Sequence, residues 1–323
     1  MKKLLMLSLM CTVLTLSVFA NGQQEASAST YPNGPVTIIC PFSPGGGSDT
    51  VSRAIAEAAK VDFPEGLVVE NKTGGGGSIG MSYGMHAKPD GYTIQMIAPE
   101  LVLLPHSGTG GDIDYKKFIP IIFVNSAYSA ITVPADSPYQ TLDDLIEAGK
   151  TKELQIGNSG IGSIWHLAAA GFAQAAGIEV THVPFDGAAP AITSLLGNHI
   201  DAVTVSYAEV QSQVEAGKLR SLAVLAPERL ADCPDVPTMS ELGYGDLSIA
   251  AWRGYAVPEG TDPAVVEYIK NSFLKATKSE SFVTFMANTH NAIDILVDDD
   301  FADRLDYEWN YFGTLMDSLG LSK

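Results

Sequence analysis

Hydrophobic positions along the chain follow two alternating patterns. Short apolar runs rich in β-branched residues are typical of strands, and between them apolar residues recur at helical spacing. The pattern predicts strands at residues 36–40, 67–70, 93–97, 119–123, 130–133, 154–157, 180–183, 202–205 and 221–225. It predicts helices at residues 50–60, 78–87, 141–148, 166–176, 189–196 and 210–216, and a helix start at Asp298. This alternation predicts an α/β fold with largely parallel sheets.

Two glycine-rich turns divide the pattern into similar halves. Each turn lies between a strand and a helix, the first at residues 40–49 and the second at residues 157–163. Ligands of open α/β sheets bind beyond the carboxyl ends of the strands, where helix N-termini point. Two such halves facing one another would form a cleft lined by backbone N–H groups.

The N-terminus has the order of an export signal. Lys2 and Lys3 precede an apolar stretch from Leu4 to Phe19, and small residues end it at Ala20. The stretch is short for a membrane span. We therefore predict a signal peptide over residues 1–20, a flexible leader over 21–30 and a periplasmic location. An uncleaved anchor helix is the alternative, and Cys11 fits a lipid-attachment site poorly because it lies inside the apolar stretch.

The charge of the chain excludes several partners. It has 19 Lys and Arg against 37 Asp and Glu, a formal net charge of −18. Binding of nucleic acid or of an anionic membrane relies on Lys and Arg, so we expect neither. With 46% hydrophobic and 17% charged residues the chain is neither disordered nor a coiled coil. Cys40 ends an apolar run, so we expect a buried free thiol there rather than a disulfide to Cys233.

The first glycine-rich turn carries the main candidate chemistry. Three consecutive glycines, Gly45 to Gly47, allow backbone N–H groups to approach a ligand, and the helix that follows presents its positive N-terminus. Ser48 or Asp49 would cap this helix. We predict a carboxylate or phosphate site here, weakened by any side chain at Gly46. A strand-to-helix loop without a ligand is the alternative.

Motifs of other functions are incomplete. Residues 75–80 match G-x-G-x-x-G, but four residues separate the motif from its strand and only Glu100 could serve as its acid. Residues 157–161 fail the G-x-S-x-G pattern of hydrolases because the last position is Ile161. The histidines lack metal-ligand spacing, and residues 298–300 lack the glycine of a calcium loop. We expect no enzyme, no cofactor and no metal.

The ordered series of segments resembles the substrate-binding proteins of tripartite tricarboxylate transporters, the Bug family. The likeness extends from about Tyr31 to Leu321. It is carried by residues 41–49 with Arg53, residues 69–80, 88–93, 182–185, 187–190, 216–224, 235–238 and 241–244, and Trp252 with Gly254.

The resemblance implies a two-lobed periplasmic-binding-protein fold of the Venus-flytrap, type II-like kind, with two open sheets and a ligand cleft between the lobes. Residues 31–124 plus 246–323 would form domain 1, and residues 125–245 domain 2. It further implies a monomeric receptor that delivers a small organic acid to a membrane permease with a large and a small subunit. The acid would be a di- or tricarboxylate, an acidic amino acid or an aromatic acid. A receptor subunit that feeds a sensor kinase is the alternative, and the sequence does not separate the two.

Position by position, the resemblance implies a ligand site built from both domains. The expected ligand-binding residues are Phe42, Ser43, Gly45, Gly46, Gly47, Ser48, Asp49, Asn158, Ser159, Gly160, Gly162, Ser163, His166, Phe185, Asp186, Gly187, Ala188, Asp201 and Ser206.

Two residues depart from the pattern of the family. Asp186 stands where a basic or small residue is usual. Facing the cleft, it would disfavour a second ligand carboxylate or prefer an ammonium or hydroxyl group. Pointing to solvent, it would be an ordinary loop acid. Trp165 is bulkier than expected, and would narrow the pocket or supply an aromatic wall.

Overall fold

The computed structural model describes residues 31–289 and 291–323. Its strands are β1 (Val36–Cys40), β2 (Leu67–Asn71), β3 (Thr93–Ile97), β4 (Phe118–Pro134), β5 (Leu154–Asn158), β6 (Val180–Pro184), β7 (Ala202–Ser206), β8 (Leu219–Leu225), β9 (Ala250–Pro258) and β10 (Leu296–Val297). Its α-helices are α2 (Gly47–Ala59), α3 (Ser78–Met85), α4 (Glu100–Leu103), α5 (Leu142–Gly149), α6 (Ile164–Ala176), α7 (Ala188–Leu196), α8 (Tyr207–Glu215), α9 (Pro263–Ala276), α10 (Glu280–Asn288) and α11 (Asp298–Ser318). Short 3₁₀ helices are η1 (Lys60–Asp62), η2 (Gly75–Gly77) and η3 (Tyr115–Lys117). The expected signal peptide, leader and Cys11 lie outside the described residues.

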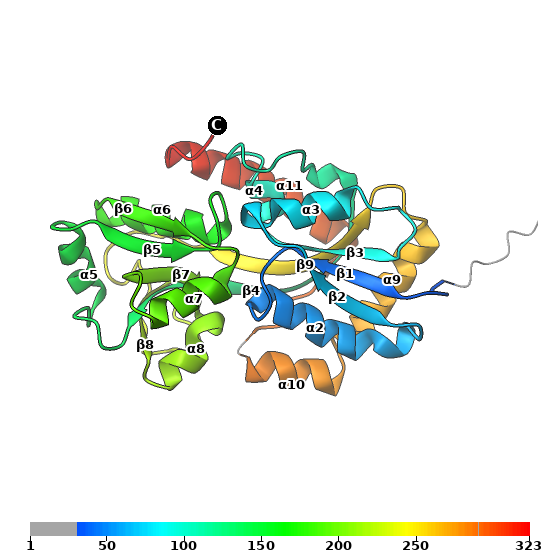
Figure 1. The fold of residues 1–323 in the computed structure, drawn as a ribbon, viewed down its shortest axis with the longest axis horizontal. Coiled ribbons are helices and arrows are strands. Elements are labelled where there is room, and N and C mark those ends of the chain that lie inside the picture. The colour runs from blue at the N-terminus through cyan, green and yellow to red at the C-terminus, as the bar shows by residue number, and fades with distance from the viewer. Residues whose placement is uncertain (1–30, 290) are drawn as a thin grey trace, which may run out of the picture. The chain divides into compact units, whose positions relative to one another are not determined.

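The strands form two sheets, one for each lobe. In the first lobe β2, β1 and β3 are parallel, and β9, β4 and β10 continue the sheet in antiparallel pairing. In the second lobe β6, β5 and β7 are parallel, while β4 pairs antiparallel with β7 and β8. Helices α3 and α11 lie on one side of the first sheet and α2 and α10 on the other, and α5 to α8 surround the second (Figure 1). The fold is α/β and two-lobed as expected.

Strand β4 belongs to both sheets. Its first part, Phe118 to Tyr128, pairs with β9, and its last part, Ser129 to Pro134, pairs with β7 and β8. The sequence predicted two strands here, because Asn125, Ser126 and Ser129 interrupt the apolar run. The structure buries Asn125 and Ser129 within one continuous strand. The expectation of largely parallel sheets was also wrong, since β4 and β9 add antiparallel pairing to both lobes.

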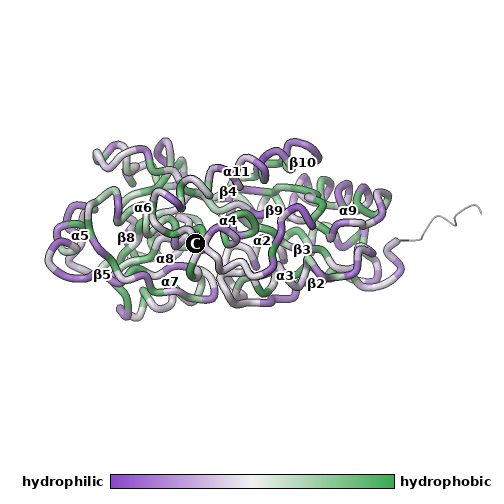
Figure 2. Tube along the Cα trace, turned by 90° about the horizontal axis from the view of Figure 1, so that it is seen from above, coloured by the Kyte–Doolittle hydropathy of each residue, from purple (hydrophilic) through white to green (hydrophobic). Residues whose placement is uncertain are grey.

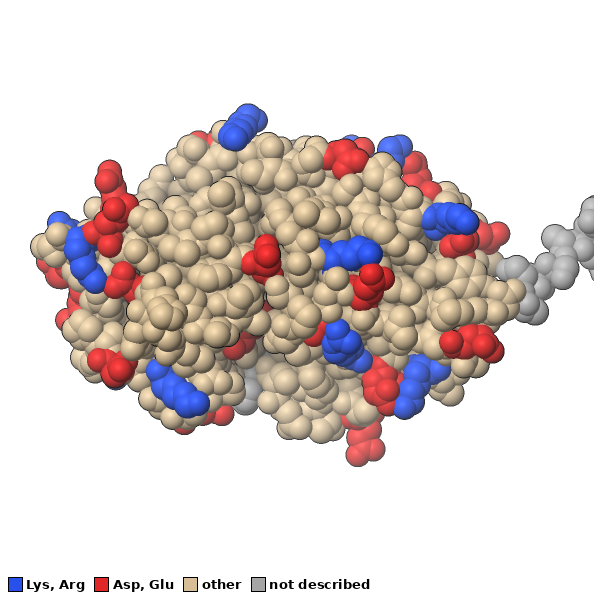
Figure 3. Space-filling view, viewed as in Figure 1, with Lys and Arg blue, Asp and Glu red and all other residues tan. Residues whose placement is uncertain are grey.

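Apolar side chains fill the space between sheets and helices. Figure 2 shows hydrophobic positions along the strands and more hydrophilic ones toward the periphery. Cys40 and Cys233 are both buried and both free, which confirms the expectation of free thiols. Acidic and basic side chains are interspersed on the face in Figure 3, without a basic stripe. No helix in the described part of the chain has the length and apolar character of a membrane span.

Candidate ligand-binding site

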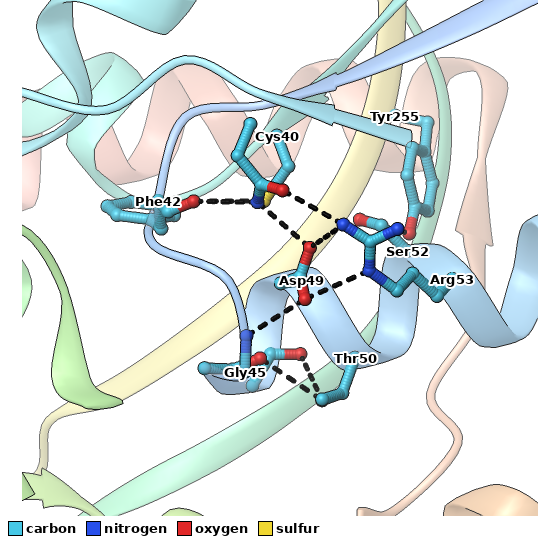
Figure 4. Close-up of polar contacts among 11 residues, drawn as sticks. Cys40, Phe42, Gly45, Asp49, Thr50, Ser52, Arg53 and Tyr255 are labelled. Atoms are coloured by element: carbon cyan, nitrogen blue, oxygen red, sulfur yellow. Dashed lines mark hydrogen bonds and ion pairs between the residues drawn. The ribbon is translucent and has the colours of Figure 1, made fainter. Parts of the chain in front are cut away.

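A buried carboxylate fixes the loop between β1 and α2 by hydrogen bonds. Asp49 is 3% exposed, and its Oδ2 accepts hydrogen bonds from Gly45 N at 2.9 Å and Arg53 Nε at 3.0 Å (Figure 4). Its Oδ1 accepts from Asn71 Nδ2 at 2.8 Å. Burial would raise the pKa of Asp49, but Arg53 and these hydrogen bonds outweigh burial and lower it. Asp49 therefore shapes the loop, and its carboxylate is fully engaged in doing so.

The N-terminus of α2 receives a carboxylate from the second lobe. Gly47 N donates to Glu209 Oε1 at 2.9 Å. The other oxygen, Glu209 Oε2, accepts from Ser206 Oγ at 2.8 Å and from Ser206 N at 3.2 Å in the capping box that begins α8. One carboxylate thus serves two helix N-termini, one in each lobe.

A second carboxylate makes the same kind of contact in the opposite direction. Glu100 of α4, in the first lobe, is 2% exposed, and its Oε1 accepts from Ile164 N at 3.0 Å, at the N-terminus of α6. Burial raises the pKa of Glu100 to about 7. Each lobe therefore supplies a carboxylate to a helix N-terminus of the other lobe.

A buried arginine lies beside these contacts. Arg253 of β9 is 2% exposed, and its Nη2 is 3.7 Å from Glu209 Oε1. A Cβ placed on Gly47 would come within 2.4 Å of Arg253 Nη2 and 2.9 Å of Glu209 Oε1. The approach of the arginine to α2 therefore depends on a glycine at position 47.

An inner cavity of about 20 Å³ opens among these groups, enough for about one water molecule. It is lined by Phe42, Ser43, Gly46, Gly47, Ser48, Ala98, Glu100, Ser159, Ile164, Trp165, Ala188, Glu209, Ala251, Trp252 and Arg253. The walls come from both lobes and from the crossing strand β9, so this cavity lies at the floor of the cleft between the lobes.

An outer cavity of about 680 Å³ shares Ser43 with the inner one. It is lined by Ser43, Gly75, Gly76, Thr109, Gly160, Ile161, Pro184, Phe185, Asp186 and Pro190. A third cavity of about 130 Å³ borders Glu209 and is lined by Gly45, Gly46, Gly47, Thr50, Ala189, Ile192, Ala208, Glu209, Thr289 and Asn291.

The two lobes touch around the outer cavity. Ser43 N donates to the backbone oxygen of Asp186 at 3.2 Å, and the Ser43 hydroxyl donates to the same oxygen. A Cβ on Gly160, whose φ is +120°, would come within 2.8 Å of Gly76 Cα. Gly75 and Gly76, from the incomplete dinucleotide motif at residues 75–80, thus line the outer cavity, and Gly76 lies where the lobes meet closely.

The structure brings together many of the residues expected to bind ligand. Those that line the inner or outer cavity are Phe42, Ser43, Gly46, Gly47, Ser48, Ser159, Gly160, Phe185, Asp186 and Ala188. Both departures from the family pattern also face the cleft: Trp165 lines the inner cavity and Asp186 the outer one.

Other expected residues support the walls instead of lining these two cavities. Gly45 lines the third cavity, Gly187 packs against Ser43, and Gly162 packs against Ser107 and Thr109. Asn158 Oδ1 accepts from Gly160 N at 3.0 Å, Ser163 Oγ accepts from His166 N at 3.2 Å, and Ser206 holds Glu209 as described.

His166 Nδ1 accepts from Gly162 N at 3.0 Å, and its ring packs edge-on against His182. Burial lowers the pKa of His166 to about 4, so the ring is neutral and stabilises its own loop.

Asp201 lies apart from the three cavities. Its Oδ1 accepts from Lys152 Nζ at 2.8 Å and from Tyr139 OH at 3.3 Å, and its Oδ2 accepts from Gln155 N at 2.9 Å. This carboxylate joins the beginnings of β5 and β7, at the end of the strands opposite to the glycine-rich turns.

Three charged residues of the inner cavity were missed from the sequence: Glu100, Glu209 and Arg253. The available signal was a charged residue inside an apolar run, as in Ala250–Pro258 around Arg253. A Cβ on Gly46 would make only an ordinary contact of 3.5 Å with Ser43 O, whereas the space at Gly47 is closed. The effect of a side chain at Gly46 on ligand binding stays a prediction.

Two α/β lobes joined by two crossing strands, with a buried cavity between them, define the class of periplasmic solute-binding proteins. The model of the tripartite tricarboxylate transporter family receptor matches residues 51–310. The chain therefore belongs to this receptor family, as the resemblance of its sequence implied. Among its relatives, protein BugT of Bordetella pertussis is 30% identical over 266 residues, which are 81% of this chain and 82% of BugT.

Solved structures agree with this assignment. A TctC solute binding protein from Polaromonas is 37% identical with a TM-score of 0.65, over 90% of this chain and 100% of that one. The periplasmic binding protein BugD is 29% identical with a TM-score of 0.86, over 91% of this chain and 100% of BugD. Rpa4515 of R. palustris, solved with adipate, shares the fold at 24% identity and a TM-score of 0.84, over 90% of this chain and 99% of that one.

Proposed function

We propose that the protein is a periplasmic receptor that captures a small organic carboxylate between its lobes and delivers it to a tripartite tricarboxylate-type permease with a large and a small subunit. The observation that carries the proposal is the inner cavity between the lobes. Its wall combines the N-termini of α2 and α6 with the guanidinium of Arg253, all three of which favour an anion.

The electrostatic argument starts from the two carboxylates already present. Glu209 accepts from the N-terminus of α2 and Glu100 from that of α6, so these termini do hold carboxylates in this fold. Each helix N-terminus is equivalent to about half a positive charge. The two termini and the guanidinium of Arg253 together supply about two positive charges, against the carboxyl groups of Glu209 and Glu100. Because burial raises the pKa of Glu100 to about 7, this group is partly neutral and a net positive charge remains for a ligand.

The contacts between the lobes support a role in delivery. Ser43 with Asp186, Gly47 with Glu209 and Glu100 with Ile164 all join one lobe to the other. A ligand that bridges both walls would favour the arrangement with these contacts over one in which the lobes are apart. A permease that recognises the closed arrangement would then select loaded receptors. In this proposal the protein releases its acid chemically unchanged.

Calorimetric titration of refolded protein, residues 21–323, tests the capture step. The panel comprises C4 to C8 dicarboxylates, citrate, acidic amino acids and aromatic acids, each with its neutral amide as control. Trp165 and Trp252 line the inner cavity and are 4% and 1% exposed. Their fluorescence should therefore change at the same ligand concentration as the calorimetric signal. We expect saturable binding of one class of acid and none of its amide. A cooperatively melting protein that binds no acid in the panel would refute the proposal.

The delivery step needs a separate measurement. Cells that carry the permease should take up the bound acid only when the receptor is also present. Mass spectrometry of the acid recovered from the protein should return its original mass. Uptake that does not depend on the receptor would contradict the transport role and leave the binding role intact.

A further inference from the structure

Arg253 has donors that the protein does not use. Its Nε and Nη1 are buried and have no hydrogen-bond partner among the described residues, and Nη2 faces Glu209 at a distance beyond a hydrogen bond. The hydroxyl of Ser159, which lines the same cavity, is likewise buried without a partner among the described residues. Buried donors without acceptors are costly, and a guanidinium is suited to a carboxylate. These donors indicate an anionic group at the floor of the cleft.

The backbone N–H groups at the inner cavity that could also bind a ligand carboxylate are already hydrogen-bonded within the protein. Gly47 N is bonded to Glu209, and Ile164 N is bonded to Glu100. A ligand carboxylate that keeps both of these contacts intact has Arg253 and Ser159 left as its partners. Since Ser43 borders both cavities, the rest of such a ligand extends past Ser43 into the outer cavity.

The outer cavity has the opposite character. Phe185, Ile161, Pro184 and Pro190 give it an apolar wall, and Asp186 is its charged residue. Among the described residues that line the three cavities, Arg253 is the one Lys or Arg. A second ligand carboxylate would therefore lie next to apolar side chains and the like charge of Asp186, with no cation among the lining residues to receive it.

We propose that the cleft selects acids with a single carboxylate, which pairs with Arg253 while the apolar, hydroxylated or aminated remainder of the ligand lies beside Asp186. This specificity rests on the proposed receptor function and narrows its ligand class from organic acids in general to monocarboxylates and amino acids. Asp186 acts here as a specificity-determining residue, because it lines the cavity through which the far end of the ligand must run. The pKa of Glu100, raised to about 7, keeps much of this side chain neutral and so limits the negative charge at the floor.

Acids that differ only at the far end test the proposal. Hexanoate, 6-aminohexanoate and adipate have the same length and end in a methyl, an ammonium and a carboxylate group, and the C4 and C8 series repeat the comparison. We expect the monocarboxylate or amino acid of one series to bind at least about tenfold more tightly than its dicarboxylate. Asp186→Asn should narrow this gap about three- to tenfold. Asp136→Asn, which alters an exposed loop acid of the same lobe outside the three cavities, should leave the gap unchanged.

The arginine is tested by two substitutions. Arg253→Gln removes the charge and should raise the Kd of every acid about thirtyfold or more. Arg253→Lys keeps the charge without the planar donors and should weaken binding about tenfold. Should the glutamine variant fail to melt cooperatively, the lysine variant together with Ser159→Ala carries the same test.

Three outcomes would overturn the proposal. The first is a dicarboxylate that binds as tightly as its monocarboxylate with Asp186→Asn making no difference, which would leave the receptor function standing. The second is unchanged affinity in folded Arg253 variants. The third is no binding of any acid in the three series, after which the broader panel of acids decides whether the receptor function itself fails.

Discussion

Replacing Gly47 by alanine should weaken the contact between the two lobes. The backbone at Gly47 is helical, so alanine fits the first turn of α2 without backbone strain. The new Cβ, however, would lie 2.4 Å from Arg253 Nη2 and 2.9 Å from Glu209 Oε1. Neither side chain can leave for solvent, because Arg253 is 2% exposed and Glu209 is held by Ser206.

The size of the effect follows from the contact that must break. The hydrogen bond from Gly47 N to the Glu209 carboxylate is a bond to a charged acceptor, worth about 1.5–3 kcal/mol. Because this bond joins the lobes, its loss weakens the closed arrangement, and the displacement of Arg253 adds to the loss of ligand affinity. A shift of about 2 kcal/mol lowers the affinity for a ligand that needs the closed arrangement roughly thirtyfold.

Gly34→Ala is the matched control, since Gly34 lines none of the three cavities and a Cβ there meets only Tyr92 Cε1 at an ordinary 3.6 Å. Calorimetry with the tightest-binding acid should give a Kd about thirtyfold higher for Gly47→Ala than for Gly34→Ala. Hydrogen exchange of peptides from residues 43–50 and 206–215 should be faster only in the Gly47 variant, with or without ligand. Equal affinities together with equal exchange in the two variants would refute the reasoning.

Two further predictions concern pH. Burial lowers the pKa of His166 to about 4, below its unfolded value of about 6.5, so stability present at neutral pH falls as the pH drops through this range. In denaturant titrations the free energy of unfolding should fall by about 2 kcal/mol between pH 7 and pH 5. His166→Asn should reduce this dependence on pH, whereas the control His199→Asn, at an exposed position, should not. Burial raises the pKa of Glu100 to about 7, so stability present below the unfolded value of 4.5 falls by about 3 kcal/mol as the pH rises to 8. The Glu100→Gln variant should therefore have a higher melting temperature than the wild-type protein at pH 8 and the same melting temperature at pH 4.5. Equal melting temperatures at both pH values would show that burial of the Glu100 charge does not lower the stability.

Periodicity in the sequence was sufficient for most strands and helices between residues 36 and 225, but the prediction lacked the short helix α4 there and β9, α9 and α10 further on. Strands such as β1 and helices such as α5 have local signals, and in the structure Thr141 caps α5 with Asp144 as its partner. The sequence predicted two strands in place of β4, because the polar residues Asn125 and Ser129 interrupt its apolar run. In the structure, pairing with strands on both sides accommodates these residues. The domain limits near residues 125 and 245 and the signal peptide stay predictions.

The glycine-rich turns were found because their signal is local, but the charged floor of the cleft was not. Glu209 fits an ordinary capping box, and Glu100 and Arg253 look like stray charges in apolar segments. What brings them together is the packing of one lobe against the other. Hydropathy of a single segment carries no information about such a contact. The sequence therefore indicated the loops of the cleft and left its electrostatics undetermined.

The long strand β4 has a mechanical consequence. Together with its partner β9 it forms a two-stranded ribbon that crosses from one lobe to the other, and its register with β9 shifts between Pro120 and Ile122 and between Phe123 and Asn125. A hydrogen-bonded ribbon flexes across its flat face more readily than it shears within its plane. We expect the lobe movement that the proposed function requires to bend this ribbon near Tyr128, where β4 passes from one sheet to the other. Bending at this one place would bring Gly47 and Glu209 back together in the same alignment.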